Sequence, residues 1–216
     1  MIAGALRAVA LLALGVPAVA TAQGSASVGI VSPPLDPDRP LYFYSAPGPG
    51  EHPSTATPFD SVTFADGDHF VGIATAPPWF APEGLKLDYD LLWMTAETLT
   101  RDWVEVVVNT MDPLPRTTRR TAWVSRADAR FRTWSEFLLE VHSVETLDPE
   151  SNPLRNTPND AAPGTGSTAG LPLRALAIRG DWMRVEGADA QEVRLPTGWI
   201  RWRADGRLLV RFSLLS

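Results

Sequence analysis

A diverged internal repeat constrains the fold of this 216-residue chain more than any other feature. Three landmarks occur twice in the same order: Leu-Asp-Pro, then Asp-Trp-hydrophobic-x-Val, then Thr-small-Trp-aliphatic. In the first copy they begin at Leu35, Asp102 and Thr121, and in the second at Leu147, Asp181 and Thr197. Ordered self-similarity is the signature of repeated structural units, so the sequence predicts two related domains.

The residue patterns within both copies predict β-strands. Residues 182–186 alternate apolar and polar side chains, as a strand with one buried face requires. Asp205-Gly206 lies between two strand-like runs and predicts a type I′ hairpin turn. Only residues 134–141 have a helical pattern, and residues 156–170 are expected to form a mobile loop. The predicted fold class is all-β.

The second copy resembles the bacterial SH3-like (SH3b) family at three elements. These are Leu154-Arg155-Asn156-Thr157-Pro158, Asp181-Trp182-Met183-Arg184-Val185 and Thr197-Gly198-Trp199-Ile200. The resemblance implies two tandem small SH3-like barrels, a diverged and enlarged one at residues 35–146 and a second at residues 147–216. It also implies that Trp182 fills the second barrel.

The first copy departs from the family pattern at two landmarks. Tyr42-Phe43-Tyr44-Ser45-Ala46-Pro47 stands where the Leu-Arg-x-x-Pro element belongs, and Ala122 replaces the expected glycine. Residues 48–100 form a long insertion, which we expect to add strands or loops to the first barrel.

The N-terminus has the three parts of an export signal. Arg7 supplies the positive charge, residues 8–16 the apolar core and residues 20–22 the small-residue cleavage pattern. We therefore expect residues 1–22 to be a signal peptide and residues 23–34 a flexible segment. The mature protein is expected to be periplasmic or secreted, without stable membrane insertion.

The charge distribution argues against nucleic acid as a partner. The chain has 19 basic and 25 acidic residues, whereas phosphate binding relies on accumulated positive charge. Residues 23–145 hold 17 acidic and 9 basic residues, a balance of −8, and residues 147–216 hold 8 and 9, a balance of +1. The two copies should therefore present different surfaces.

No set of residues in the sequence assembles a catalytic or metal site. The chain has no cysteine, and His52, His69 and His142 lack the spacing of metal ligands. Asp66-Gly67-Asp68 lacks the remaining ligands of a calcium loop and is interpreted as a turn. We expect no catalytic residue, no metal and no cofactor. The alternative is a hydrolase built on the acidic residues of the insertion.

Aromatic side chains are the remaining candidates for ligand binding. Trp79 lies in a proline-rich stretch where its ring either contacts a ligand or anchors the loop. Trp199 and Trp202 should face opposite sides of a strand, one in the core and the other more exposed. Arg201 and Arg203 share the face opposite Trp202, as a basic strip with Arg184 and Arg194 or as a solvated face. The candidate groove residues are Tyr42, Tyr44, Trp79, Trp202 and Arg203.

These observations favour a non-catalytic exported binding protein that engages peptidoglycan, another cell-wall component or an envelope protein. The ligand class follows only from the SH3-like resemblance. The alternative is a structural or assembly subunit of an envelope protein complex.

Overall fold

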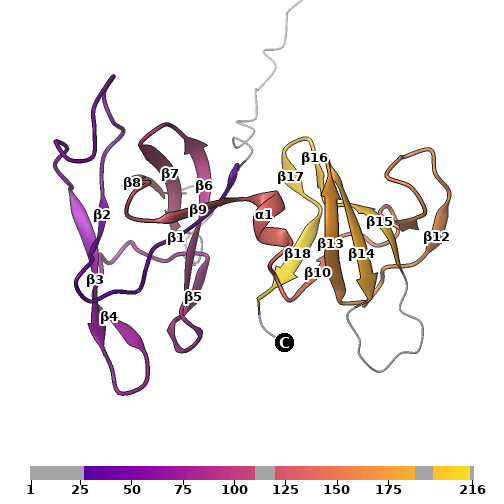
Figure 1. Cartoon of the computed structure of the whole chain (residues 1–216), viewed down its shortest axis with the longest axis horizontal. Helices are drawn as coiled ribbons and strands as arrows, with labels where there is room; N and C mark the ends of the chain where they lie inside the picture. Colours follow the sequence, from indigo (N-terminus) through magenta and orange to yellow (C-terminus); the bar gives the residue numbers. More distant parts are fainter. Residues whose placement is uncertain (1–26, 110–119, 188–196, 215–216) are drawn as a thin grey trace, which may run out of the picture.

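The computed structural model describes residues 27–109, 120–187 and 197–214. About half of the chain lies in β-strands, and one sheet curls into half a barrel, so the all-β prediction is confirmed. Figure 1 shows two groups of strands on either side of the short helix α1 (Trp134–Leu138). We call the described part of residues 27–133 the first lobe and that of residues 143–214 the second lobe.

The first lobe contains a six-stranded and a three-stranded sheet. The main path of the larger sheet is β8 (Arg120–Ser125), β7 (Trp103–Asn109), β6 (Leu91–Leu99), β1 (Gly29–Ser32) and β9 (Arg130–Thr133). β5 (Gly84–Lys86) also pairs with β6, and the 3-10 helix η1 (Leu87–Tyr89) follows it. The smaller sheet is β2 (Leu41–Phe43), β3 (Asp60–Asp66) and β4 (Val71–Thr75). Residues 48–100 thus hold four strands, β3, β4, β5 and β6, of which only β6 lies on the main path of the larger sheet.

The second lobe contains a seven-stranded sheet and a small hairpin. The sheet order is β12 (Gly164–Gly166), β11 (Leu154–Arg155), β15 (Thr197–Arg201), β14 (Trp182–Gly187), β13 (Leu173–Arg179), β10 (Ser143–Thr146) and β18 (Val210–Ser213). The hairpin joins β16 (Arg203–Ala204) to β17 (Arg207–Leu208). Asp205 and Gly206 connect them with φ angles of 48° and 73°, which confirms the predicted type I′ turn.

The two large sheets share strand order, register and an irregularity. β8-β7-β6-β1-β9 corresponds strand by strand to β15-β14-β13-β10-β18. Glu105 lies opposite Trp123 in the first lobe, as Arg184 lies opposite Trp199 in the second. The corresponding strands β6 and β13 carry a bulge at the same place, after Ala96 in β6 and after Ala175 in β13. The Asp-Trp and Thr-small-Trp landmarks therefore occupy equivalent positions in the two sheets.

The Leu-Asp-Pro landmark forms the same kind of turn in both lobes. The Asp36 carboxylate accepts the Asp38 N–H at 2.9 Å, and the Asp148 carboxylate accepts the Glu150 N–H at 3.2 Å. In both cases an aspartate side chain bonds to the backbone two residues on, as in an Asx turn. Each turn leads into the next strand of its lobe, β2 or β11.

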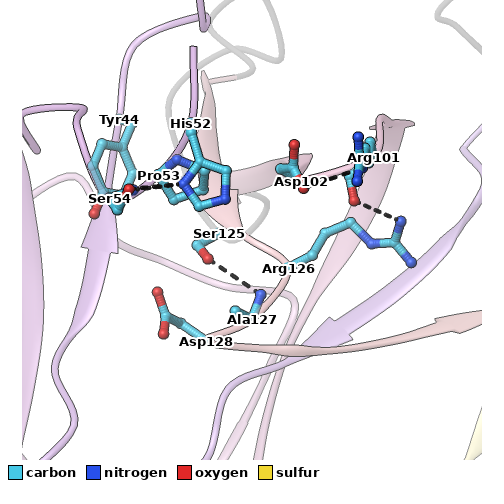
Figure 2. A pocket seen from close by; sticks show the side chains of 10 residues that line it. All are labelled: Tyr44, His52, Pro53, Ser54, Arg101, Asp102, Ser125, Arg126, Ala127 and Asp128. Atoms are coloured by element: carbon cyan, nitrogen blue, oxygen red, sulfur yellow. Dashed lines mark hydrogen bonds and ion pairs between the residues drawn. The ribbon is translucent and has the colours of Figure 1, made fainter. Parts of the chain in front are cut away.

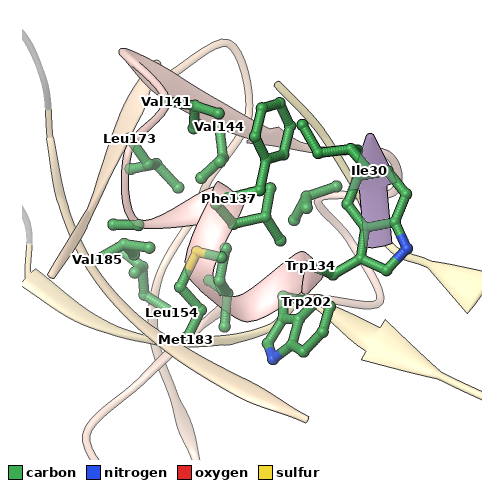
Figure 3. Packing of buried hydrophobic residues seen from close by; sticks show 14 of the residues in the cluster. Ile30, Trp134, Phe137, Val141, Val144, Leu154, Leu173, Met183, Val185 and Trp202 are labelled. Atoms are coloured by element: carbon green, nitrogen blue, oxygen red, sulfur yellow. The ribbon is translucent and has the colours of Figure 1, made fainter. Parts of the chain in front are cut away.

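The apolar cores meet at β1 and α1. Ile30 and Val31, neighbours in β1, are both fully buried but belong to different clusters, because successive side chains of a strand point to opposite faces. Val31 packs in the first-lobe core, whereas Ile30 joins Trp134 and Phe137 of α1 in the second-lobe core. Figure 3 shows the helix residues between Ile30 and the second-lobe side chains. The lobes therefore share one apolar contact region.

Three segments differ from the sequence expectations. Residues 29–32, expected in a flexible segment, form β1, because Ile30 and Val31 are needed in two cores. Residues 143–146, assigned to the first unit, form β10, which pairs with strands of the second lobe. Within residues 156–170, expected to be mobile, β12 pairs with β11 and Thr168 is buried against the Thr146 hydroxyl at 2.7 Å. The expected signal peptide, residues 1–22, lies outside the described residues.

Candidate functional site

A polar pocket of about 580 Å³ opens on the first lobe. Three segments line it: the chain after β2, the turn between β6 and β7, and the connection from β8 to β9. Figure 2 shows the lining side chains, which are Tyr44, His52, Pro53, Ser54, Arg101, Asp102, Ser125, Arg126, Ala127 and Asp128. Segments far apart in the sequence thus converge on one surface depression.

Trp103 and Arg126 hold these segments in place. The buried Trp103 indole donates to the Glu51 carbonyl at 2.9 Å and packs edge-on against Tyr44, with ring centroids 4.9 Å apart. The Arg126 guanidinium donates to the carbonyls of Thr100 and Arg101 at 3.0 and 3.1 Å. The first contact ties the loop after β2 to β7, and the second ties the β6–β7 turn to the chain after β8. The pocket walls are therefore fixed by hydrogen bonds to backbone carbonyls.

Tyr44 and Asp128 give the pocket its electrostatic character. Burial raises the pKa of the Tyr44 hydroxyl, and the negative charges of the Asp128 carboxylate and of Tyr42 raise it further. Tyr44 therefore remains a neutral hydroxyl at physiological pH and can donate or accept a hydrogen bond. Asp102 and Asp128 add two carboxylates to the lining, which suit a ligand that brings a cationic or hydrogen-bond-donating group.

His52 and Ser54 form a local turn rather than an assembled catalytic pair. His52 Nδ1 accepts the Ser54 N–H at 3.2 Å and lies 2.9 Å from the Ser54 hydroxyl. A nucleophile–base pair requires a third group that orients the base. Among the described residues, no carboxylate is bonded to this imidazole. The arrangement can bind polar groups, and nothing in it activates the hydroxyl.

A second depression adjoins the first. It has a volume of about 770 Å³ and shares His52, Arg101 and Asp102 with the first pocket. The proline- and glycine-rich residues 47–50 form one wall, and Trp123 contributes a partly exposed indole. Both depressions therefore combine acidic and aromatic residues, and Asp102 lines both.

The expected groove residues of the first lobe have separate positions. Tyr44 is buried and lines the first pocket, whereas Tyr42 points outward from β2 and is 39% exposed. Trp79 packs edge-on against Phe43 at 5.1 Å, and the Arg120 guanidinium covers its ring at 4.0 Å. Trp79 therefore anchors its loop on the core, which was the simpler of its two sequence interpretations.

The expected groove residues of the second lobe do not join those of the first. Trp202 is only 3% exposed, lies in the second-lobe core and donates to the Gly180 carbonyl at 2.9 Å. Trp199 lies in β15 and is partly exposed, whereas Trp202 follows the end of that strand. Arg203 pairs with Asp181 at 3.1 Å. Trp202 is unavailable to a ligand in this structure because the core covers it.

Sequence reasoning missed most of the pocket lining. His52 was considered only as a metal ligand, and Asp102 and Asp128 were not singled out. The usable signal was the repeat, because Arg126-Ala127-Asp128 recurs as Arg203-Ala204-Asp205 after the last landmark. No sequence pattern predicts that the three loops lining the pocket converge on one another.

Within the described parts of the chain, no group of three or more acidic or histidine side chains could hold a metal ion. In the same residues, no helix is long and apolar enough to cross a bilayer. No protein-family model, no curated protein and no solved structure matches the chain.

Proposed function

We propose that this chain is a non-catalytic, exported binding protein of two SH3-like barrels, whose first lobe engages a cell-wall component or an envelope protein. The strand order supports the barrel assignment. In each large sheet the first strand lies between the second and the last, so five strands can wrap around one core. The shared register and bulge support a common origin for the two lobes.

The polar pocket around Tyr44 carries the functional proposal. It combines a neutral phenol, two carboxylates and fixed loop walls, and it is large enough for a peptide segment or a sugar unit. Binding sites of this type consist of a preformed concavity with a few placed polar groups. A ligand with an amino group, such as a cell-wall peptide or a lysine-bearing protein loop, matches Asp102 and Asp128.

The proposed location in the periplasm or outside the cell rests on the N-terminal pattern of Arg7, the apolar core and the small residues 20–22. Fractionation of cells that express the tagged chain tests it, with N-terminal sequencing of the product. A cytoplasmic protein that keeps residue 1 would remove the export proposal.

Co-sedimentation with purified peptidoglycan tests the binding proposal. The double substitution Asp102→Asn and Asp128→Asn should abolish or strongly reduce pelleting, because it removes both carboxylates while keeping their size. The matched control is Asp66→Asn with Asp68→Asn, at the β3–β4 turn away from the pocket. If wild-type protein fails to pellet at low salt, and cross-linking to envelope proteins is also unaffected by the double substitution, the pocket is not the binding site.

A structural or assembly subunit is the second candidate, and one observation favours it. In the described three-stranded sheet, β4 pairs only with β3, and Phe70, directly before β4, is 45% exposed. A free edge with exposed apolar groups is a typical place for another chain to add a strand. A pull-down that retains defined protein partners after wall digestion, and loses them when Ile73 is changed to Pro, would favour this function.

A further inference from the structure

Tryptophan and arginine alternate across the outward face of the second lobe. Trp182 in β14 lies opposite Arg179 of β13 and Arg201 of β15. Two residues further along the strands, Trp199 in β15 lies opposite Arg184 of β14 and Arg155 of β11. Each indole thus has an arginine directly beside it on both sides.

Two arginines of this region are neutralised by aspartates. Arg201 forms an ion pair with Asp160, and Arg203 forms one with Asp181. The Arg201 guanidinium also lies 5.1 Å from the centre of the Trp182 ring. The Arg155 guanidinium lies 6.0 Å from the same ring, so two arginines cover Trp182, which is only 9% exposed. Trp182 is not part of the second-lobe core cluster, where it was expected.

Three further arginines, Arg155, Arg179 and Arg184, form no ion pair with an acidic side chain in the described part of the chain. Arg155 donates to the carbonyls of Asp160 and Ala162, which do not cancel its charge. Arg179 and Arg184 are exposed, and among the described residues neither has an acidic partner. The Arg179 guanidinium lies 5.7 Å from the Trp199 ring centre. We call Trp199, Arg155, Arg179 and Arg184 the Trp199 face.

The first lobe demonstrates that the fold does not require these arginines. Trp123, the counterpart of Trp199, lies opposite Glu105, where the second lobe has Arg184. On its other side, Trp123 forms a backbone β-bridge with Tyr44. Tyr44 therefore occupies the position that Arg155 has beside Trp199 in the second lobe. The same frame thus holds a tryptophan with a glutamate and a tyrosine in one lobe, and with arginines in the other.

We propose that the Trp199 face binds an acidic polysaccharide through its carboxylate groups. A guanidinium presents parallel N–H donors that match a carboxylate in a bidentate pair. A neighbouring indole limits the motion of the guanidinium and offers an apolar surface to a sugar ring. Charge and aromatic surface are therefore presented together.

The spacing of the arginines favours a polymer over a single small anion. Arg184 and Arg155 flank the strand of Trp199 and are therefore two strand positions apart, about 10 Å at the backbone. The Arg155 guanidinium is held at the carbonyls of Asp160 and Ala162, whereas the Arg179 guanidinium lies at the Trp199 ring, so a chain with a repeating acid can meet guanidiniums at separate places. The acidic first lobe does not prevent this, because charges beyond about 8 Å are largely screened at physiological ionic strength.

Titration calorimetry with polygalacturonate tests the proposal on the full chain. The variant Arg179→Gln with Arg184→Gln should weaken binding roughly tenfold or more, because it removes two charge-assisted contacts. Its salt dependence should also decrease. The matched control, Arg39→Gln with Arg207→Gln, removes the same charge from exposed positions outside the face and should leave affinity within about twofold.

Two further ligands decide the chemistry. Fully methyl-esterified polygalacturonate keeps the sugars but loses the charges, and it should not bind. Inorganic polyphosphate keeps the charges but lacks the sugars, and it should bind more weakly than polygalacturonate. The proposal is overturned if the arginine double variant binds like wild type, if the ester binds equally well, or if only polyphosphate binds. Circular dichroism establishes that each variant is folded.

Discussion

The two lobes share one strand arrangement but differ in the region beside Trp123 in the first lobe and Trp199 in the second. In the first lobe, the chain after β2 leaves a polar pocket beside Tyr44. In the second lobe, Arg155 takes the equivalent position and donates to the carbonyls of the loop that follows it. Arg201 then pairs with Asp160 from that loop, and Arg203 with Asp181. Arginine side chains and their ion pairs therefore occupy the region of the second lobe that corresponds to the open pocket of the first.

The comparison distinguishes the inward-facing strand positions, which the two lobes share, from the outward-facing positions, which differ. The inward positions match between the lobes, with Val124 and Ile200 both fully buried at the same register position. The outward positions change in charge and size, from Glu105 to Arg184 and from Tyr44 to Arg155. Burial therefore constrains the inward positions, whereas the outward positions are free to vary.

The largest expected effect is at the shared contact region. Phe137 of α1 is 1% exposed and packs against Trp93 of the first lobe and Phe212 of the second, with ring centroids 5.9 and 4.9 Å away. Phe137→Ala should lower the free energy of unfolding by about 3–5 kcal/mol. Because residues of both lobes line this cluster, urea unfolding of the wild type should be a single transition by fluorescence and circular dichroism.

The exposed neighbour Leu139 provides the control. Leu139→Ala should change the free energy of unfolding by no more than about 0.5 kcal/mol. Two separate transitions in the wild type, or equal losses for the two variants, would mean that the lobes are independent units that merely touch.

The next largest effect is expected at the small residue of the Thr-small-Trp landmark, which is Gly198 in the second lobe. A Cβ atom at Gly198 would lie 2.9 Å from the Arg155 carbonyl oxygen and 3.2 Å from the Leu154 side chain. Gly198→Ala should therefore cost about 1–3 kcal/mol of stability, measured by urea unfolding. The first lobe has Ala122 at the same register position, opposite Val106 as Gly198 is opposite Val185.

Gly72→Ala in β4 is the matched control, since a Cβ atom there meets nothing closer than 4.0 Å. It should leave stability unchanged or raise it by about 0.5 kcal/mol, because alanine restricts the unfolded chain. A Gly198→Ala protein as stable as wild type would mean that close approach of β11 does not explain the glycine.

The sequence predicted the frame better than the site for a physical reason. Alternation, β-branched residues and Asp205-Gly206 report on local backbone geometry, and these signals located β7, β14 and the β16–β17 hairpin. β1 was missed because its short apolar run at residues 29–32 is buried on both faces and therefore does not alternate. The pocket depends on loops that meet only in the folded chain, so no local pattern encodes it.

The cap of helix α1, between the two lobes, provides a smaller effect. The Thr133 hydroxyl accepts the Glu136 N–H at 3.3 Å, and the Glu136 carboxylate accepts the Thr133 N–H at 2.8 Å, which forms a capping box. Thr133→Ala should cost about 1 kcal/mol. Thr133→Ser keeps the hydroxyl and should recover most of that loss in urea unfolding, and a serine variant as unstable as the alanine variant would rule out the cap as the cause.

The smallest expected effect is at the Leu-Asp-Pro turns. Hydrogen bonds from Ser151, first from its side chain and then from its backbone, hold the pKa of the Asp148 carboxyl below its usual value. A carboxyl whose pKa is lower in the folded state stabilises the protein above its unfolded pKa, and this stabilisation is lost as the pH falls through the folded value. Asp148→Asn should therefore lower the urea midpoint slightly at pH 6, and the difference from wild type should disappear in acid.

Asp36→Asn makes the same change in the first lobe, where the carboxylate accepts one N–H, from Asp38, instead of two, from Glu150 and Ser151. Its effect at pH 6 should be the smaller of the two, because the Asp36 carboxylate accepts one fewer hydrogen bond. A difference from wild type that stays constant between pH 6 and acid would assign the loss to turn geometry instead of charge. Equal effects of the two substitutions would mean that the two turns are energetically equivalent.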